Sequence, residues 1–162
     1  MNIFVLDWDI TKCARYHCDQ HVSKMILESA QLLCTALNKK GRKTPYSSTH
    51  INHPCTLWVG ESYDNFIWLS KLATALNAEY RYRFNKPSDH KSLSVIKEIS
   101  NERYEAIGLT AFPQAMPDEY KKPGDPVVAY RRFYVGEKLS FARWTRRRKP
   151  KWITDVTPKC KI

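Results

Sequence analysis

Two histidines, a lysine and a glutamate interrupt an otherwise apolar stretch near the start of the chain. The segment 16–31 reads YHCDQHVSKMILESAQ and carries His17, His21, Lys24 and Glu28. At about 100° of rotation per residue, an α-helix would place these four side chains within about 60° of arc. A lysine beside a carboxylate and imidazoles gives coupled titrations, which suit general acid–base catalysis near neutral pH. The spacing therefore predicts a catalytic cleft along one face of a helix.

The rest of that helix favours a buried position. Its remaining circumference is largely apolar, which is the inverse of the broad polar face of an ordinary surface helix. The alternative is a solvated face on which Lys24 and Glu28 form an i,i+4 ion pair worth a few tenths of a kcal/mol. Histidines add little to a solvated face, so the cleft is the preferred interpretation.

A metal site is a third interpretation of the same segment. Zinc accepts histidine and cysteine as ligands. Such residues occur in two groups, which are Cys13, His17 and His21, and His50, His53 and Cys55. Their spacing matches no strong zinc pattern, and the charge of Lys24 would repel a cation. We therefore expect no metal and no cofactor.

The charge of the chain points to a polyanionic partner. The 162 residues carry a formal net charge of +11, so nucleic acid is the first candidate and an anionic membrane surface the second. The stretch RWTRRRKPKW holds six basic and no acidic residues. A solvated tail is the alternative, but interleaved aromatic and basic residues favour a surface that grips duplex DNA. The expected phosphate contacts are Arg131, Arg132, Lys138, Arg143, Arg146, Arg147, Arg148 and Lys149.

The composition also limits the class of protein. The chain is 43% hydrophobic and 12% aromatic, which favours a folded globule over disorder. No apolar run approaches about 18 residues, and the opening MNIFVLDWD lacks the regions of a secretory signal. An odd number of cysteines without such a signal predicts reduced thiols. We expect a cytoplasmic monomer without membrane association, with one helical domain over residues 1–162 and a basic C-terminal segment over residues 143–162.

Four helices are expected to position the stripe. Their approximate spans are residues 9–38, 54–84, 88–103 and 126–148. Asp9 or Thr11 can cap the first helix, Ser88 the third, and Asp125 the fourth, with Pro126 at its first position. No strand with alternating apolar residues is evident. The prediction is an all-α, compact single domain of three to four main helices with irregular loops, in which the first helix contacts the second and the last.

Three patches of the sequence resemble one family of DNA repair enzymes. DQHVSKMILE, residues 19–28, is similar to a motif of the pyrimidine-dimer DNA glycosylase (phage endonuclease V) family, namely D-Q-H, six residues and a catalytic glutamate. Residues 53–84, from HPCTLW to RYRF, resemble the central helix of that family. AYRRFYVGEK, residues 129–138, resembles its Y-x-x-Y-G-K stretch. The patches occur in the order that the family has.

The resemblance implies a compact all-helical enzyme acting on duplex DNA. In that family an α-amine, freed by removal of methionine, attacks the sugar C1′, displaces the base and forms an imine. A glutamate stabilises the cationic sugar and shuttles protons. Matched residue by residue, Glu28 takes the role of this glutamate, and His21 that of a neighbouring DNA contact. The residues expected to bind substrate around them are His17, Asp19, Gln20, Glu61, His90 and Lys91.

Two positions depart from the family pattern. The family has a small residue after methionine where this chain has Asn2, and it carries arginine where this chain has Leu27. The nucleophile is therefore open between the α-amine of Met1, the side chain of Lys24 with a pKa lowered by burial, and an activated water molecule. Met1 and Asn2 are both counted among the catalytic candidates.

Three functions remain as hypotheses. The leading one is a DNA glycosylase, with or without abasic-site lyase activity, acting on damaged or modified bases. The second is an enzyme of the same fold that acts on a nucleotide or another phosphorylated small molecule. The third is a DNA-binding accessory protein without chemistry. Such a binder has no need of a glutamate in a cleft that should prefer phosphate, and salt-dependent affinity for duplex DNA separates the first hypothesis from the second.

Overall fold

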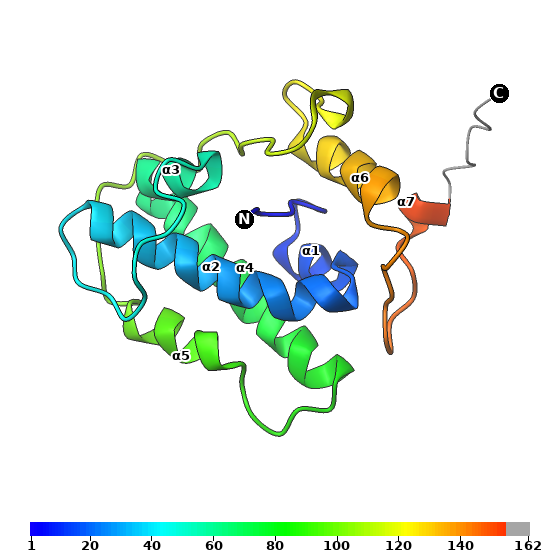
Figure 1. Cartoon of the computed structure of the whole chain (residues 1–162), viewed down its shortest axis with the longest axis horizontal. Coiled ribbons are helices and arrows are strands. Elements are labelled where there is room, and N and C mark those ends of the chain that lie inside the picture. The colour runs from blue at the N-terminus through cyan, green and yellow to red at the C-terminus, as the bar shows by residue number, and fades with distance from the viewer. Residues whose placement is uncertain (155–162) are drawn as a thin grey trace.

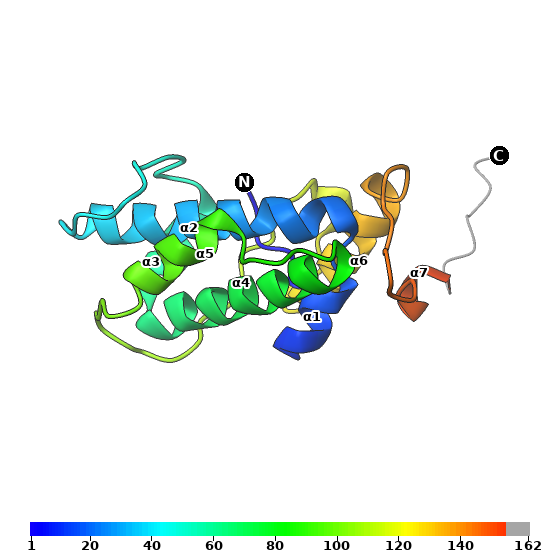
Figure 2. The same cartoon turned by 90° about the horizontal axis from the view of Figure 1, so that it is seen from below.

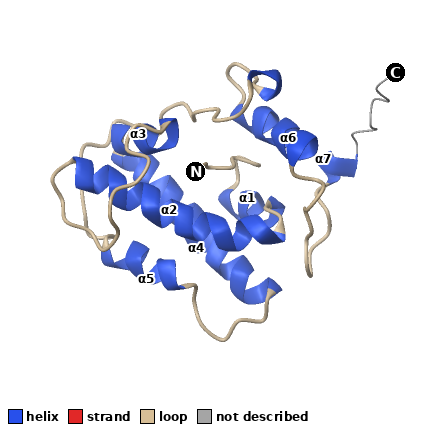
Figure 3. Ribbon diagram, in the orientation of Figure 1, coloured by secondary structure: helices blue, strands red, loops and turns tan. Residues whose placement is uncertain are grey.

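The computed structural model describes residues 1–154, and this part of the chain is helical and contains no strand. The elements are α1 (Ile10–Tyr16), α2 (Asp19–Lys39), α3 (Pro54–Glu61), α4 (Tyr63–Arg83), α5 (Lys91–Glu98), the 3₁₀ helix η1 (Asp118–Tyr120), α6 (Pro126–Glu137) and α7 (Lys151–Thr154) (Figures 1 and 3). The all-α prediction is confirmed. The helices outnumber the predicted three to four, because two predicted helices are each divided in two. No helix within residues 1–154 has both the length and the apolar character needed to cross a membrane.

Helix α2 lies at the centre of the fold, as predicted. It runs alongside α4 and also packs against α3 and α5, while α1 packs against α4 (Figure 1). This packing on several sides explains why most of the circumference of α2 is apolar. Helix α6 reaches α2 through Tyr134, whose hydroxyl oxygen lies 2.6 Å from Nδ1 of His21. The predicted contact between α2 and the last long helix, α6, is therefore made by the side chains of His21 and Tyr134.

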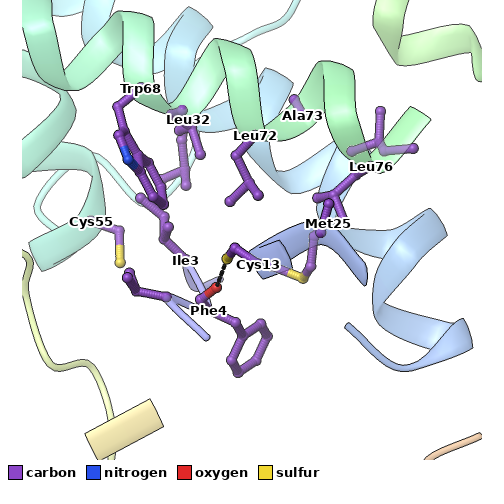
Figure 4. Packing of buried hydrophobic residues seen from close by; sticks show 14 of the residues in the cluster. Ile3, Phe4, Cys13, Met25, Leu32, Cys55, Trp68, Leu72, Ala73 and Leu76 are labelled. Carbon is purple, nitrogen blue, oxygen red and sulfur yellow. Dashed lines mark hydrogen bonds between the residues drawn. The ribbon is translucent and has the colours of Figure 1, made fainter. Parts of the chain in front are cut away.

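The first residues of the chain run through the interior. Residues 3–6 belong to no helix, and each has an exposed fraction of 5% or less. Figure 4 shows Ile3 beside Cys55 of α3, and a hydrogen bond of 3.2 Å from Sγ of Cys13 to the carbonyl oxygen of Phe4. The burial of these apolar side chains stabilises the segment. It thereby fixes the start of the chain next to α2 and α3.

The predicted first helix is interrupted between α1 and α2, and this corrects the proposed stripe. His17 and Cys18 have extended backbones, with ψ angles of 134° and 161°. The buried guanidinium of Arg83 donates to the carbonyl oxygen of His17 at 2.7 Å and to that of Arg15 at 2.8 Å. These carbonyl groups are hydrogen-bonded without a continuing helix. His17 therefore does not lie on the polar face of α2.

The predicted second helix is also two helices. Ser62 has an extended backbone, with φ of −149° and ψ of 140°, and separates α3 from α4. Its hydroxyl oxygen accepts a hydrogen bond from the N–H of Asp64 at 3.2 Å, which is N-cap geometry. The N–H of Tyr63 donates to the carbonyl oxygen of Glu105 at 2.9 Å, outside the helix. The prediction of one continuous helix over residues 54–84 was wrong because it passed over this serine cap.

Helix α5 is shorter than predicted and begins later. It starts at Lys91 and ends at Glu98, short of the expected residue 103. The N-cap is His90, whose Nδ1 accepts a hydrogen bond from the N–H of Ser92 at 3.1 Å. The predicted cap, Ser88, lies outside the helix.

Helix α6 keeps its predicted start but ends early. Asp125 caps it through a hydrogen bond from the N–H of Val128, and Pro126 is its first residue. The helix stops at Glu137 instead of continuing to residue 148. The chain beyond it lies against the start of α2, where the N–H of Asp19 donates to the carbonyl oxygen of Arg143 at 2.8 Å.

Candidate active site

The carboxylate of Glu28 lies beside the start of the chain. The α-amine nitrogen of Met1 is 3.7 Å from Oε2 of Glu28, and the backbone N–H of Asn2 donates to the same oxygen at 3.1 Å. On the other side, Nζ of Lys24 lies 3.7 Å from Oε1. The Glu28 side chain is 12% exposed, whereas that of Lys24 is 64% exposed. Two amines thus flank one largely buried carboxylate, and four of the five predicted catalytic residues lie together.

The side chain of Asn2 holds the N-terminus in this position. Its Nδ2 donates to the carbonyl oxygen of Ala115 at 2.9 Å, and its Oδ1 accepts from the hydroxyl of Tyr130 in α6 at 2.8 Å. Tyr130 is fully buried. Sequence reasoning missed both partners, because they lie more than a hundred residues from Asn2 and no local pattern connects them.

His21, the fifth predicted catalytic residue, is buried next to the N-terminal segment. Its ring stacks on Phe4 with 4.4 Å between ring centroids. Burial lowers the pKa of His21 to about 3, and the positive charges of Lys138 and Lys24 contribute to the lowering. The imidazole is therefore neutral at pH 7. The expectation of a histidine that titrates near neutral pH is wrong for this residue.

The hydroxyl of Tyr134 forms a hydrogen bond with His21. The Tyr134 hydroxyl oxygen accepts from the N–H of Cys18 at 3.3 Å, and Nδ1 of His21 lies 2.6 Å from it. The sulfur of Cys18 is a more distant acceptor, at 3.7 Å. Burial raises the pKa of Tyr134 well above its usual value, so the hydroxyl keeps its proton. The neutral imidazole of His21 therefore forms a hydrogen bond through Nδ1 with a protonated Tyr134 hydroxyl.

His17 is part of the core instead of the cleft. It is completely buried, and its Nδ1 donates to the carbonyl oxygen of Cys13 at 2.7 Å. Burial lowers the pKa of His17 to about 4, and the nearby charge of Arg83 acts in the same direction. The predicted role of His17 in substrate binding therefore has no support from its position.

His53 and Cys55, considered in the sequence only as metal ligands, lie at the N-terminus of α3 near Met1. Nδ1 of His53 accepts from the N–H of Cys55 at 3.1 Å. Partial burial lowers the pKa of His53, with the positive N-terminus acting in the same direction. Burial raises the pKa of Cys55 to about 12, so its sulfur remains a thiol and not a nucleophilic thiolate. Within residues 1–154 no group of three or more histidine, cysteine or acidic side chains is arranged to hold a metal ion.

Asp19 forms hydrogen bonds with two segments that are distant in the sequence. Its carboxylate accepts hydrogen bonds from the hydroxyl of Thr145 at 2.6 Å and from the buried Arg83 at 3.2 Å. These contacts join the first turn of α2 to the chain after α6 and to the end of α4. Gln20 beside it is exposed to solvent and free to contact a ligand.

The remaining predicted substrate-binding residues lie away from the Met1–Glu28 pair. Glu61 ends α3, at the opposite end from Cys55, and accepts from the hydroxyl of Thr110 at 2.7 Å. His90 caps α5 and its ring packs on that of Tyr80 in α4. Lys91 is exposed at the start of α5. The structure therefore does not bring these three residues into one site with Glu28.

The predicted phosphate contacts fall into two groups. Three of the arginines are engaged within the protein. Arg131 donates to Leu6 and forms an ion pair with Asp7, Arg147 forms an ion pair with Glu79, and Arg146 donates to the carbonyl oxygen of Tyr82. Lys138 lies over the ring of Phe133, with 4.7 Å from Nζ to the centroid. The second group consists of the exposed Arg132, Arg143, Arg148 and Lys149. Arg146 is exposed as well, but its guanidinium contacts Tyr82. Of the predicted basic segment 143–162, residues 155–162 lie outside the described part of the chain.

Comparison with protein-family models, with curated proteins and with solved structures finds no match to this chain. The geometry around Glu28 is therefore the evidence from which a function can be argued.

Proposed function

We propose that the protein is a DNA glycosylase with abasic-site lyase activity that acts on damaged or modified bases in duplex DNA. The observation that carries this proposal is the α-amine of Met1, 3.7 Å from Oε2 of the largely buried Glu28. An α-amine is ordinarily a weaker base than a lysine side chain, so a larger share of such amines is neutral and nucleophilic at pH 7. The Asn2 nitrogen lies at 3.1 Å from the same oxygen, so a chain without Met1 would also present an α-amine to Glu28.

The chemistry begins with attack of the neutral amine on C1′ of the target nucleotide. A nitrogen–carbon bond forms as the glycosidic bond breaks, and the base leaves with the electron pair and takes up a proton from the amine. Opening of the sugar ring transfers the second amine proton to O4′ and leaves an imine between the protein and C1′. Each atom is accounted for without a cofactor or an oxidant.

Glu28 has two roles in this reaction. Its carboxylate stabilises the positive charge that develops on the sugar as the base departs, an electrostatic effect that is strong in a site with little water. It also relays the first amine proton, which it takes from the attacking nitrogen and passes to the departing base. Neutral His21 forms a hydrogen bond to the DNA near the reacting sugar.

The surface charge favours a polymeric substrate over a free nucleotide. The net charge of +11 and the exposed basic residues after α6 suit an extended phosphate backbone. This observation ranks the nucleotide-processing enzyme second. The accessory protein ranks third, because a largely buried carboxylate beside an amine contributes nothing to phosphate binding.

The experiment that tests the function is borohydride reduction in the presence of duplex DNA with one abasic site. Hydride adds to the imine carbon and fixes the protein to the DNA, so we expect a covalent complex that withstands denaturation. Without borohydride we expect strand cleavage at the same site. If neither product forms on abasic DNA, the lyase mechanism is wrong.

We expect the exposed basic residues to provide most of the duplex affinity. The triple variant Arg143→Gln, Arg148→Gln and Lys149→Gln should bind duplex DNA more weakly. Its plot of log affinity against log salt should become shallower by up to about 0.9 for each phosphate that the protein no longer neutralises. Its melting temperature should stay close to that of the native protein, because these side chains are exposed. Fluorescence anisotropy over a range of salt concentrations measures the first two effects.

Arg147→Gln is the matched control. Arg147 forms an ion pair with the buried Glu79, with 2.8 Å between Nη2 and Oε1. Its removal should therefore lower stability, by about 1–3 kcal/mol for a charged hydrogen-bonding partner, and change the salt dependence less than the triple variant does. Equal effects of both variants on DNA binding would contradict the division into two groups.

A further inference from the structure

A pocket of about 480 Å³ opens on α2 next to Glu28. Its lining is Leu27 and Gln31 from α2 together with residues 45–49 of the α2–α3 loop. Volumes of this size are typical of small-molecule sites. The function proposed above assigns no role to this pocket.

The pocket lies on the same side of α2 as the Met1–Glu28 pair. Gln31 follows Glu28 by three residues, which is about 4.5 Å along the helix axis and about 60° around it. Figure 2 shows the N-terminus and the loop between α2 and α3 together on the side of α2 that faces away from α4. The same loop leads to His53, at the N-terminus of α3. The pocket therefore lies about one helical turn along α2 from the carboxylate.

The loop wall of this pocket is fixed by hydrogen bonds. Nδ2 of Asn38 donates to the carbonyl oxygen of Tyr46 at 3.0 Å and to the hydroxyl oxygen of Ser48 at 3.2 Å. The N–H of Thr49 donates to the hydroxyl oxygen of Thr35 at 3.1 Å. A wall that is tied to α2 in this way can position a ligand without first being ordered.

Two polar groups of the lining are left for a ligand. Neither the carboxamide of Gln31 nor the hydroxyl of Ser47 makes a hydrogen bond to any other group in the described part of the chain. A carboxamide offers an acceptor oxygen and a donor nitrogen side by side. Leu27, with 39% of its surface exposed, adds an apolar contact. Together these groups suit the flat face and the polar edge of a nucleobase.

We propose that this pocket receives the target base once it has left the DNA stack, and that Gln31 reads an edge on which a hydrogen-bond donor and an acceptor are adjacent. The inference rests on the proposed function. Enzymes that act on a base must take it out of the duplex, and a glutamine pairs with the N6/N7 edge of adenine through two hydrogen bonds. With C1′ at the Met1 amine, the base extends along α2 towards Gln31.

The test uses a complex in which the pocket is empty. The protein is bound to duplex DNA that carries a tetrahydrofuran abasic analogue, and free adenine or unsubstituted purine is added. Adenine has the adjacent donor and acceptor, whereas purine lacks the amino group. Calorimetry should show a preference for adenine of about fivefold or more. Gln31→Ala should remove this preference, and Asn101→Ala, which removes an exposed carboxamide elsewhere, should keep it.

Borohydride trapping on a natural abasic site separates the two levels of the proposal, because that substrate has no base. If trapping occurs but the adenine preference is absent, or is unchanged in Gln31→Ala, the base pocket is wrong and the enzyme function stands. If the native protein gives no trapped complex, the enzyme function itself fails.

Discussion

We expect Glu28→Gln to reduce turnover on damaged or modified duplex DNA by about a hundredfold or more, in line with the loss of one acid–base group. The substitution keeps the volume of the side chain but removes its negative charge. Both the stabilisation of the cationic sugar and the acceptance of the amine proton depend on that charge. Duplex binding should survive, because a carboxylate near DNA can only oppose phosphate. Turnover, duplex affinity and melting temperature, measured on one preparation, are the three readouts.

The control for this variant is Glu98→Gln, which removes an exposed carboxylate from α5. It should change none of the three readouts. The alternative role for Glu28 is a structural one, in an ion pair with Lys24. In that case Glu28→Gln would shift the melting temperature and leave turnover near normal. Full activity in Glu28→Gln would end the glycosylase interpretation.

Acetylation of the N-terminal amine should abolish borohydride trapping, because an amide nitrogen is not nucleophilic and cannot form the imine. Extension of the chain ahead of it should reduce trapping by about a hundredfold, because displacing a reacting group by about 1 Å can cost that much. The amine has to lie against Glu28 to attack C1′, and there is no room to spare where the Met1 side chain is only 4% exposed. Mass spectrometry of the digested complex should locate the cross-link on the N-terminal peptide.

Lys24→Ala separates the two possible amines. Lys24 also lies 3.7 Å from Glu28, but its side chain is mostly in solvent. A lysine that forms an imine is usually held in a site shielded from water, which is not the position of Lys24. We therefore expect trapping by Lys24→Ala to continue at close to the native rate. A cross-link on Lys24 in the native protein, or loss of trapping in Lys24→Ala, would identify the Lys24 side chain as the nucleophile.

The sequence was informative wherever the signal is local. Lys24 and Glu28 meet because residues four apart share a helix face, and this spacing is visible in the sequence. Residue type predicted the cap at Asp125 and left Asp9 or Thr11 as the cap of the first helix; Asp9 and Asp125 both accept a backbone N–H at the start of their helices. Apolar periodicity likewise identified α2 as a central helix.

What the sequence concealed depends on contacts between distant residues. The break at His17 is stabilised by a hydrogen bond from Arg83, which lies 66 residues away in the sequence. No residue type near His17 indicates this break. Arg147 and Arg148 are adjacent and alike in the sequence, yet Arg147 is paired with Glu79 and Arg148 is exposed. The partners of Asn2 are equally remote. The difference lies in tertiary packing, which overrides what a single position suggests.

The hydrogen bond between Asn2 and Tyr130 spans 128 residues, and it has a consequence for how the protein is made. Closing so long a loop costs entropy that is recovered only when the elements between its ends are folded. A nascent chain that has not yet emerged as far as α6 lacks the hydroxyl that orients Asn2. The α-amine that we propose as the nucleophile is synthesised before α6 and is among the last groups to be positioned. During translation this amine is therefore not yet aligned with Glu28, and the proposed activity would require the completed fold.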